Sequence, residues 1–176
     1  MNSPFSKLYL AIVERLTAKV PALKYIEQDF GQLQGYSNRP AVAFPCALVD
    51  FSKFNFDEIG NYHQIADGIV SINLGFALYS ASSNITPLEF RKEPLMHYEI
   101  EWCIHKALHG WSPGDEFGKL TRVSVHSVNT PMAVRVRPIS FKLSFEDYSV
   151  DMGYDTANVD ELELSTTIVD SHFVNP

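Results

Sequence analysis

The sequence lacks the hydrophobic segments that would place it in or across a membrane. Among its 176 residues there is no run of about 18 apolar residues, the length that a membrane-spanning helix needs. Residues 1–7 also lack the basic stretch, followed by an apolar one, that marks a secretory signal. We therefore expect a protein that is neither secreted nor held in a membrane.

Basic residues are scarce and are outnumbered by acidic ones. Fourteen Lys and Arg stand against 21 Asp and Glu, a formal net charge of −7. Residues 148–176 hold six of the acidic residues and no basic one, so residues 1–147 carry 15 acidic and 14 basic residues. Because binding to a phosphate backbone needs clustered Lys and Arg, we expect no direct sequence-specific binding to nucleic acid.

Cysteine is scarce, and the common catalytic motifs are missing. Cys46 and Cys103 both lie in apolar surroundings, which favours two buried free thiols over the alternative of a disulfide. There is no Gly-x-Ser-x-Gly elbow, no phosphate-binding Gly-rich loop and no dinucleotide fingerprint. The sequence thus predicts no catalytic residue, no cofactor and no enzymatic activity.

Two segments have the periodicity of amphipathic helices. The first begins with Ser3 as its expected cap and Pro4 at its first position, and Pro21 ends it. Its apolar stripe consists of Phe5, Leu8, Tyr9, Ile12, Val13, Leu16 and Val20. The second runs from about Pro94 to His109, with Gly110 at the position of a left-handed cap. Its expected apolar face is Met96, Ile100, Cys103, Ile104, Ala107 and Leu108.

Other segments alternate between apolar and polar residues, as strands do. The clearest are residues 70–79 and residues 134–147. Residues 120–128 and residues 42–51 are further strands, and residues 24–30 alternate weakly. Pro45 within the second of these indicates an edge position, a bulge or a strand that begins after it. Residues 52–67, with Asn55, Gly60 and Asn61, are predicted to be a long connection within a hairpin.

This order of elements predicts an α+β fold. We expect a mainly antiparallel sheet of about four to five strands with two main helices packed on one face. One domain would span residues 1–147, and residues 148–176 would form an acidic C-terminal extension.

One pattern favours an alternative function as a small metal-binding domain or enzyme. His97, Glu101, His105 and His109 recur at four-residue steps and so share one helix stripe, and His and Glu are acceptable zinc ligands. The other interpretation is a polar outer face of the helix. No other segment has metal-ligand spacing, so we predict no metal site.

Aromatic and apolar residues outside the predicted elements indicate assembly contacts. Phenylalanines at 51, 54 and 56 are either packed under the core or offered to a partner. The acidic C-terminal extension is too apolar for a purely solvating tail. It either packs on a neighbouring subunit, for instance as an added strand, or folds back on its own domain. The candidate contact residues are Phe51, Phe54, Phe56, Ile168, Val169 and Phe173.

Short apolar signatures accompany this order of elements. They are the helix start Phe5-Ser6-Lys7-Leu8, the hairpin of residues 44–51 and 68–79, the helix ending Leu108-His109-Gly110-Trp111, then Leu120-Thr121-Arg122, and the closing strand at residues 141–147. In these features, which cover about residues 4–147, the sequence resembles the phage tail-terminator and tail-completion (head–tail joining) proteins, as found in prophages of Bacteroides-type bacteria.

This resemblance implies a structural role rather than catalysis. Members of the family form a ring, usually hexameric, that stops polymerisation of the tail tube and joins the tail to the head. The expected partners are therefore copies of this chain, tail-tube proteins and head–tail connector proteins. The expected location is the bacterial cytoplasm during assembly and then the virion tail. A generic protein-binding module with the same fold is a further alternative.

Overall fold

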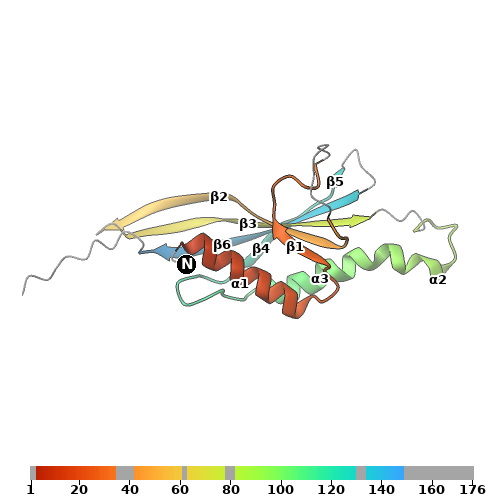
Figure 1. Ribbon diagram of the computed structural model, residues 1–176, viewed down its shortest axis with the longest axis horizontal. Helices are drawn as coiled ribbons and strands as arrows, with labels where there is room; N and C mark the ends of the chain where they lie inside the picture. Colours follow the sequence, from red (N-terminus) through yellow and green to blue (C-terminus); the bar gives the residue numbers. More distant parts are fainter. Residues whose placement is uncertain (1–2, 35–41, 61–62, 78–81, 130–133, 149–176) are drawn as a thin grey trace, which may run out of the picture.

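The computed structural model describes residues 3–34, 42–60, 63–77, 82–129 and 134–148. In these ranges a long twisted sheet lies on one side and the helices on the other (Figure 1). None of the helices in the described ranges is long and apolar enough to cross a membrane. The elements are α1 (Pro4–Lys19), β1 (Tyr25–Gln28), β2 (Cys46–Gly60), β3 (His63–Ala77), α2 (Leu88–Arg91), η1 (Glu93–Leu95), α3 (Met96–Leu108), β4 (Thr121–Val125), β5 (Val128–Asn129) and β6 (Val134–Asp147).

The sheet confirms the predicted α+β class. Its strand order is β1-β2-β3-β6-β4, and the two-residue β5 also pairs with β6, so six strands take part where four to five were expected. Every pairing is antiparallel except that of β1 with β2. The parallel β1 is the segment whose alternation was weak in the sequence, which is consistent with its four-residue length.

The prediction of a long connection over residues 52–67 is wrong. β2 continues to Gly60 and β3 begins at His63, so these residues form the outer half of a hairpin with two 15-residue strands. The prediction depended on Asn55, Gly60 and Asn61 as turn residues. Asn55 in fact pairs with Asp67 inside the ladder. Cross-strand pairing therefore outweighed the low strand propensity of Asn and Asp here.

The main core lies between one face of the sheet and the two long helices. Leu8, Ile12 and Leu16 of α1 and Ile104 and Leu108 of α3 are fully buried. The strand residues that meet them recur at every second position, as predicted for the alternating segments. They are Ala66, Val70, Ile72, Leu74 and Phe76 of β3 and Ile139, Phe141, Leu143 and Phe145 of β6.

A smaller apolar cluster covers part of the opposite face. It consists of Leu33, Cys46, Leu48 and Val136, all buried. Burial raises the pKa of the Cys46 thiol to about 11, which keeps the thiol protonated and unreactive. Both cysteines are free, as predicted, but only Cys46 is buried and Cys103 is half-buried, so the predicted burial holds for Cys46 alone.

Several helix ends agree with the sequence and some details do not. α1 begins at Pro4 and ends before Pro21, and Gly110 has a φ of 77° beyond the end of α3. Ser3, however, makes no side-chain capping hydrogen bond. Met96 was assigned to the apolar face of the second helix, but 49% of its surface is exposed because it starts α3 at the outer end of the helical layer.

The predicted strand at residues 120–128 is divided into β4 and β5. Val125 pairs with Ile139 and Val128 pairs with Val136. Between these two pairs the partner strand carries Pro138, which has no N–H to donate. The ladder is therefore interrupted there, and only the bond from His126 N–H to the Pro138 carbonyl, at 3.3 Å, bridges the gap.

Phenylalanine rings hold the outer hairpin to α1. The register of β2 and β3 shifts between Phe51 and Lys53, so Phe54 follows Phe51 on the helix-facing side of the hairpin. The ring of Phe5 lies 5.4 Å from that of Phe51 and 5.2 Å from that of Phe54. The Phe54 ring also covers Gly68, its cross-strand partner.

We predict that Gly68→Ala destabilises the hairpin. A Cβ at this position would overlap the Phe54 ring and lie 2.5 Å from the Lys53 carbonyl oxygen. Overpacking of this kind costs about 1–3 kcal/mol, and urea unfolding would measure the loss. Gly114→Ala is the control, because its Cβ would meet only a Phe117 ring carbon at 3.6 Å. Equal unfolding midpoints for the two variants would contradict the close packing of Phe54 on Gly68.

Candidate functional site

The outer edge of the hairpin is open over most of its length. β1 pairs only with Cys46–Val49 of β2, and the last bond on that side joins Asp29 N–H to the Val49 carbonyl at 2.9 Å. No strand within the described ranges pairs with β2 on this side from Asp50 to Gly60. This stretch, which we call the open β2 edge, extends past the N-terminal end of α1 (Figure 1).

An edge of this length is suited to pairing with another chain. A free strand edge presents unpaired N–H and C=O groups, which natural proteins usually shorten, cover or interrupt. Here Lys53 and the register shift beside it interrupt the edge near its start. Farther out, Phe56 and Ile59 are 41% and 54% exposed. The open β2 edge therefore combines free backbone groups with exposed apolar side chains.

The three predicted contact phenylalanines differ in their surroundings. Phe51 and Phe54 are half-buried and pack against the main core. Phe56 is the most exposed of the three, with its ring 6.5 Å from that of Phe5. Of the set, Phe56 presents the largest surface to a partner. Ile168, Val169 and Phe173 lie outside the described residues, so the predicted contacts there stay predictions.

The histidine stripe of α3 is not a polar outer face. It is directed at β6 and β4, where three arginines meet it. His97 is buried, and Glu101 accepts a hydrogen bond from Arg137 with an Nε–Oε2 distance of 2.6 Å. At the other end, His109 Nδ1 accepts a hydrogen bond from the Arg122 N–H at 3.1 Å. The stripe thus forms a polar seam between helix and sheet, which we call the α3–β6 seam.

The two hydrogen bonds of His97 define its protonation state. His97 Nδ1 lies 2.8 Å from the Pro94 carbonyl and Nε2 lies 2.9 Å from Arg135 Nη1. A carbonyl only accepts and a guanidinium only donates, so the ring must be neutral with its proton on Nδ1. Burial, followed by the nearby charges of Arg135 and Arg137, lowers the pKa of His97.

The stripe does not gather its potential metal ligands. No group of three or more His, Cys, Asp or Glu side chains in the described ranges is close enough to hold a metal ion. The His105 and His109 rings are 4.8 Å apart, but Glu101 is paired with Arg137 and His97 with Arg135. These pairings remove the ligand set on which the metal-binding alternative depended.

Sequence reasoning missed the arginines of the seam. Arg135 and Arg137 precede Ile139 at two-residue steps, so they project from β6 on the same side as its buried residues. Two arginines in phase with an apolar strand face predict acidic or polar partners on the element that covers it. The sequence therefore contained both halves of the seam: the arginines at 135 and 137 and the histidine and glutamate stripe at 97–109.

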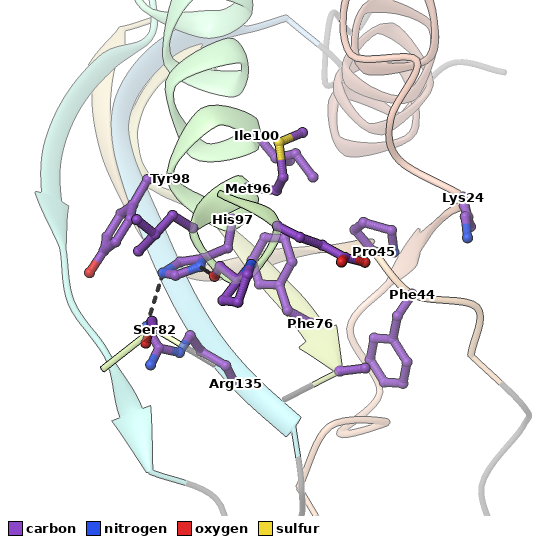
Figure 2. A pocket seen from close by; sticks show the side chains of 14 residues that line it. Lys24, Phe44, Pro45, Phe76, Ser82, Met96, His97, Tyr98, Ile100 and Arg135 are labelled. Carbon is purple, nitrogen blue, oxygen red and sulfur yellow. Dashed lines mark hydrogen bonds between the residues drawn. The ribbon is translucent and has the colours of Figure 1, made fainter. Parts of the chain in front are cut away.

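A cavity of about 310 Å³ lies where η1 and the start of α3 meet the ends of β3 and β6. Figure 2 shows the residues that line it: the His97 ring and the Arg135 side chain lie together on one side, joined by their hydrogen bond, and Phe76 and Ile100 also line it. Phe44, Pro45 and Lys24 lie on the far side. The cavity joins an apolar lining to two basic side chains at one end of the seam.

Among known proteins, similarity is found to solved structures. No protein-family model matches the sequence, and no curated protein matches it. A solved structure described as the virion of a native gene transfer agent (GTA) particle superimposes with a TM-score of 0.49 and 14% sequence identity. The match covers 80% of this chain and 95% of that chain. The likeness is a weak one.

We predict that Glu101→Ala lowers the free energy of unfolding by about 2–3 kcal/mol, because it leaves the Arg137 guanidinium without a carboxylate in a largely buried position. The two side chains are only 14% and 13% exposed. Glu116→Ala is the matched control, since the Lys7–Glu116 pair is 3.0 Å long but 45% and 37% exposed, and should lose less than about 1 kcal/mol. If the two variants lost similar free energies of unfolding in urea, the expectation that the buried Glu101–Arg137 pair contributes more than the exposed Lys7–Glu116 pair would be wrong.

We also predict that the protein loses stability as the pH falls below about 6.5. The folded His97 has a lowered pKa, so in this range the unfolded chain binds the proton first and stability decreases until the folded pKa is reached. The charged groups that act on His97 are Arg135, Arg137 and Glu101. In urea unfolding at several pH values, His97→Phe should reduce this dependence, and the remainder should come from His105, whose pKa burial also lowers. The exposed His126, as His126→Gln, should keep it, and an unchanged slope in His97→Phe would refute the assignment.

Proposed function

We propose that the chain is a structural, non-enzymatic subunit of a phage or prophage virion. In this proposal it assembles with copies of itself into a ring, usually hexameric in the family it resembles, and acts as a tail terminator or head–tail joining protein. The observation that carries the proposal is the open β2 edge on a hairpin that extends past α1. A strand edge of this kind is a pairing surface.

A ring needs two different surfaces on each subunit. Contacts that are head-to-tail rather than self-complementary close into rings when the rotation between subunits allows it. The sheet has two unlike edges, the open β2 edge on one side and the five-residue β4 on the other. The main core between them, with two helices over one sheet face, is a rigid support for such contacts.

The proposed contact residues lie at the far end of the hairpin and in the C-terminal extension. Phe56 and Ile59 supply exposed apolar surface beside the open β2 edge. Phe51 and Phe54 would hold the hairpin in position through Phe5. Ile168, Val169 and Phe173 would pack on a neighbouring subunit or on a tail-tube or connector protein. The protein would act in the bacterial cytoplasm during assembly and then in the virion tail.

A tail-tube assay tests this function directly. The chain would be co-expressed with the tail-tube protein of the same phage or prophage, and tube lengths would be measured by negative-stain electron microscopy. Tubes of limited length with a ring at one end are the expected result. Long tubes without any bound copy of the chain, together with no binding to connector proteins, would refute the proposal. A generic protein-binding module would also leave tube length unchanged.

We predict that charge on the hairpin weakens self-association. Ile59→Lys and Phe56→Lys place ammonium groups beside the open β2 edge, and lysine on an edge strand opposes pairing with another strand. Light scattering on a sizing column should show a smaller mass than for the wild type at the same concentration. Leu10→Lys is the control, because Leu10 is 50% exposed on α1, away from both edges of the sheet. Loss of mass in the control alone would contradict the role of the hairpin.

A further inference from the structure

The cavity beside His97 lies at the opposite end of the sheet from the hairpin tip. Its walls include Phe76 of β3 and Arg135 of β6, which are cross-strand partners. The last pair of the same ladder is Gln64 with Asp147, close to the end of the described chain. Twelve steps of the ladder separate the two pairs, which is about 40 Å. The C-terminal segment, residues 149–176, therefore starts about 40 Å from the cavity.

The cavity has an apolar lining and a basic rim. Phe44, Phe76 and Ile100 line it, and Lys24 and Arg135 contribute the positive charges. Arg135 donates to His97, and the described ranges contain no salt bridge to either Arg135 or Lys24. Among the residues that the structure describes, Glu93 is the one acidic residue in the lining. Because a guanidinium has five N–H donors and neutral His97 takes one, Arg135 retains donors for a carboxylate.

One segment of the same chain has the matching chemistry. Residues 160–164 read Asp-Glu-Leu-Glu-Leu, so two leucines alternate with acidic residues. The whole stretch 149–176 contains six acidic residues and no Lys or Arg. We propose that the cavity binds residues 160–164 of a second copy of this chain. A leucine occupies the apolar lining, and a neighbouring glutamate carboxylate is held by Arg135 and Lys24.

The length of the intervening chain favours a second copy over the same one. The chain advances fourteen residues from Tyr148 to Leu162, the first leucine of this stretch, and fully extended these span about 46–50 Å. That is only slightly more than the straight distance along the ladder to the cavity, so a path around the surface of the same molecule would need an almost fully extended chain. A neighbouring molecule has no such restriction, because its cavity can lie next to the hairpin tip.

This contact would join unlike ends of two molecules. The C-terminal segment leaves at the hairpin end and the cavity lies at the other end, so each copy donates a segment to one neighbour and accepts one from another. Such a head-to-tail contact is heterologous and extends or closes into a ring. It is separate from the open β2 edge and deepens the proposed function by naming a second contact between subunits.

A mixing experiment with full-length variants tests the inference. The donor variant carries Glu161→Lys and Glu163→Lys, and the acceptor variant carries Lys24→Glu. Each alone should self-associate at least about tenfold more weakly than the wild type in sedimentation equilibrium. An equimolar mixture should form 1:1 pairs, because the intact segment of the acceptor variant fits the intact cavity of the donor variant. Lys24 is exposed, so its substitution leaves the core unchanged.

Two controls separate this contact from net charge and from the hairpin. Asp151→Lys with Asp155→Lys makes the same change in charge outside residues 160–164 and should associate like the wild type. Lys53→Glu reverses a charge on the hairpin and should leave pairing of the mixture intact. Donor variants that associate like the wild type, a mixture without pairs, or a wild type that stays monomeric would each overturn the inference. The tail-tube assay would still decide the proposed function independently.

Discussion

Packing of one sheet face against α1 and α3 holds the rest of the molecule in place. Every second residue of β3 and β6 is buried against the helices, so a shift of one residue in register would turn the apolar side chains to solvent. The same alternation carries Arg135 and Arg137 to the helix side. The main core and the α3–β6 seam are thus two parts of a single alternation along β6.

The register shift beside Ser52 extends this packing beyond the helical layer. Because one extra residue stands in β2 at that point, Phe54 and Phe51 both face α1, where Phe5 meets them. The ring contacts support the outer hairpin although none of the described helices covers its far end (Figure 1). The open β2 edge is therefore presented by a supported strand pair, and this is what makes it suitable for a contact between subunits.

The opposite end of the sheet has a different chemistry. There the seam ends in a cavity where neutral His97 orients Arg135 and apolar rings form the lining. The hairpin end presents backbone groups and exposed apolar side chains, whereas the cavity end presents basic groups. A subunit with two unlike ends is suited to directional assembly. The proposed contacts at the open β2 edge and at the cavity would use these two ends.

The sequence by itself determined the α+β class, the long strand at residues 134–147 and both long helices, because these depend on local periodicity and on Pro and Gly signals. It also determined that the two cysteines are free, since apolar neighbours are visible in the chain. Only the tertiary structure decided that residues 52–60 and 63–67 are strands and that the histidine stripe meets arginines. Those outcomes depend on pairing between different segments, from 3 positions apart at the hairpin tip to 38 positions apart for Arg135 and His97, which a periodicity within one segment does not contain.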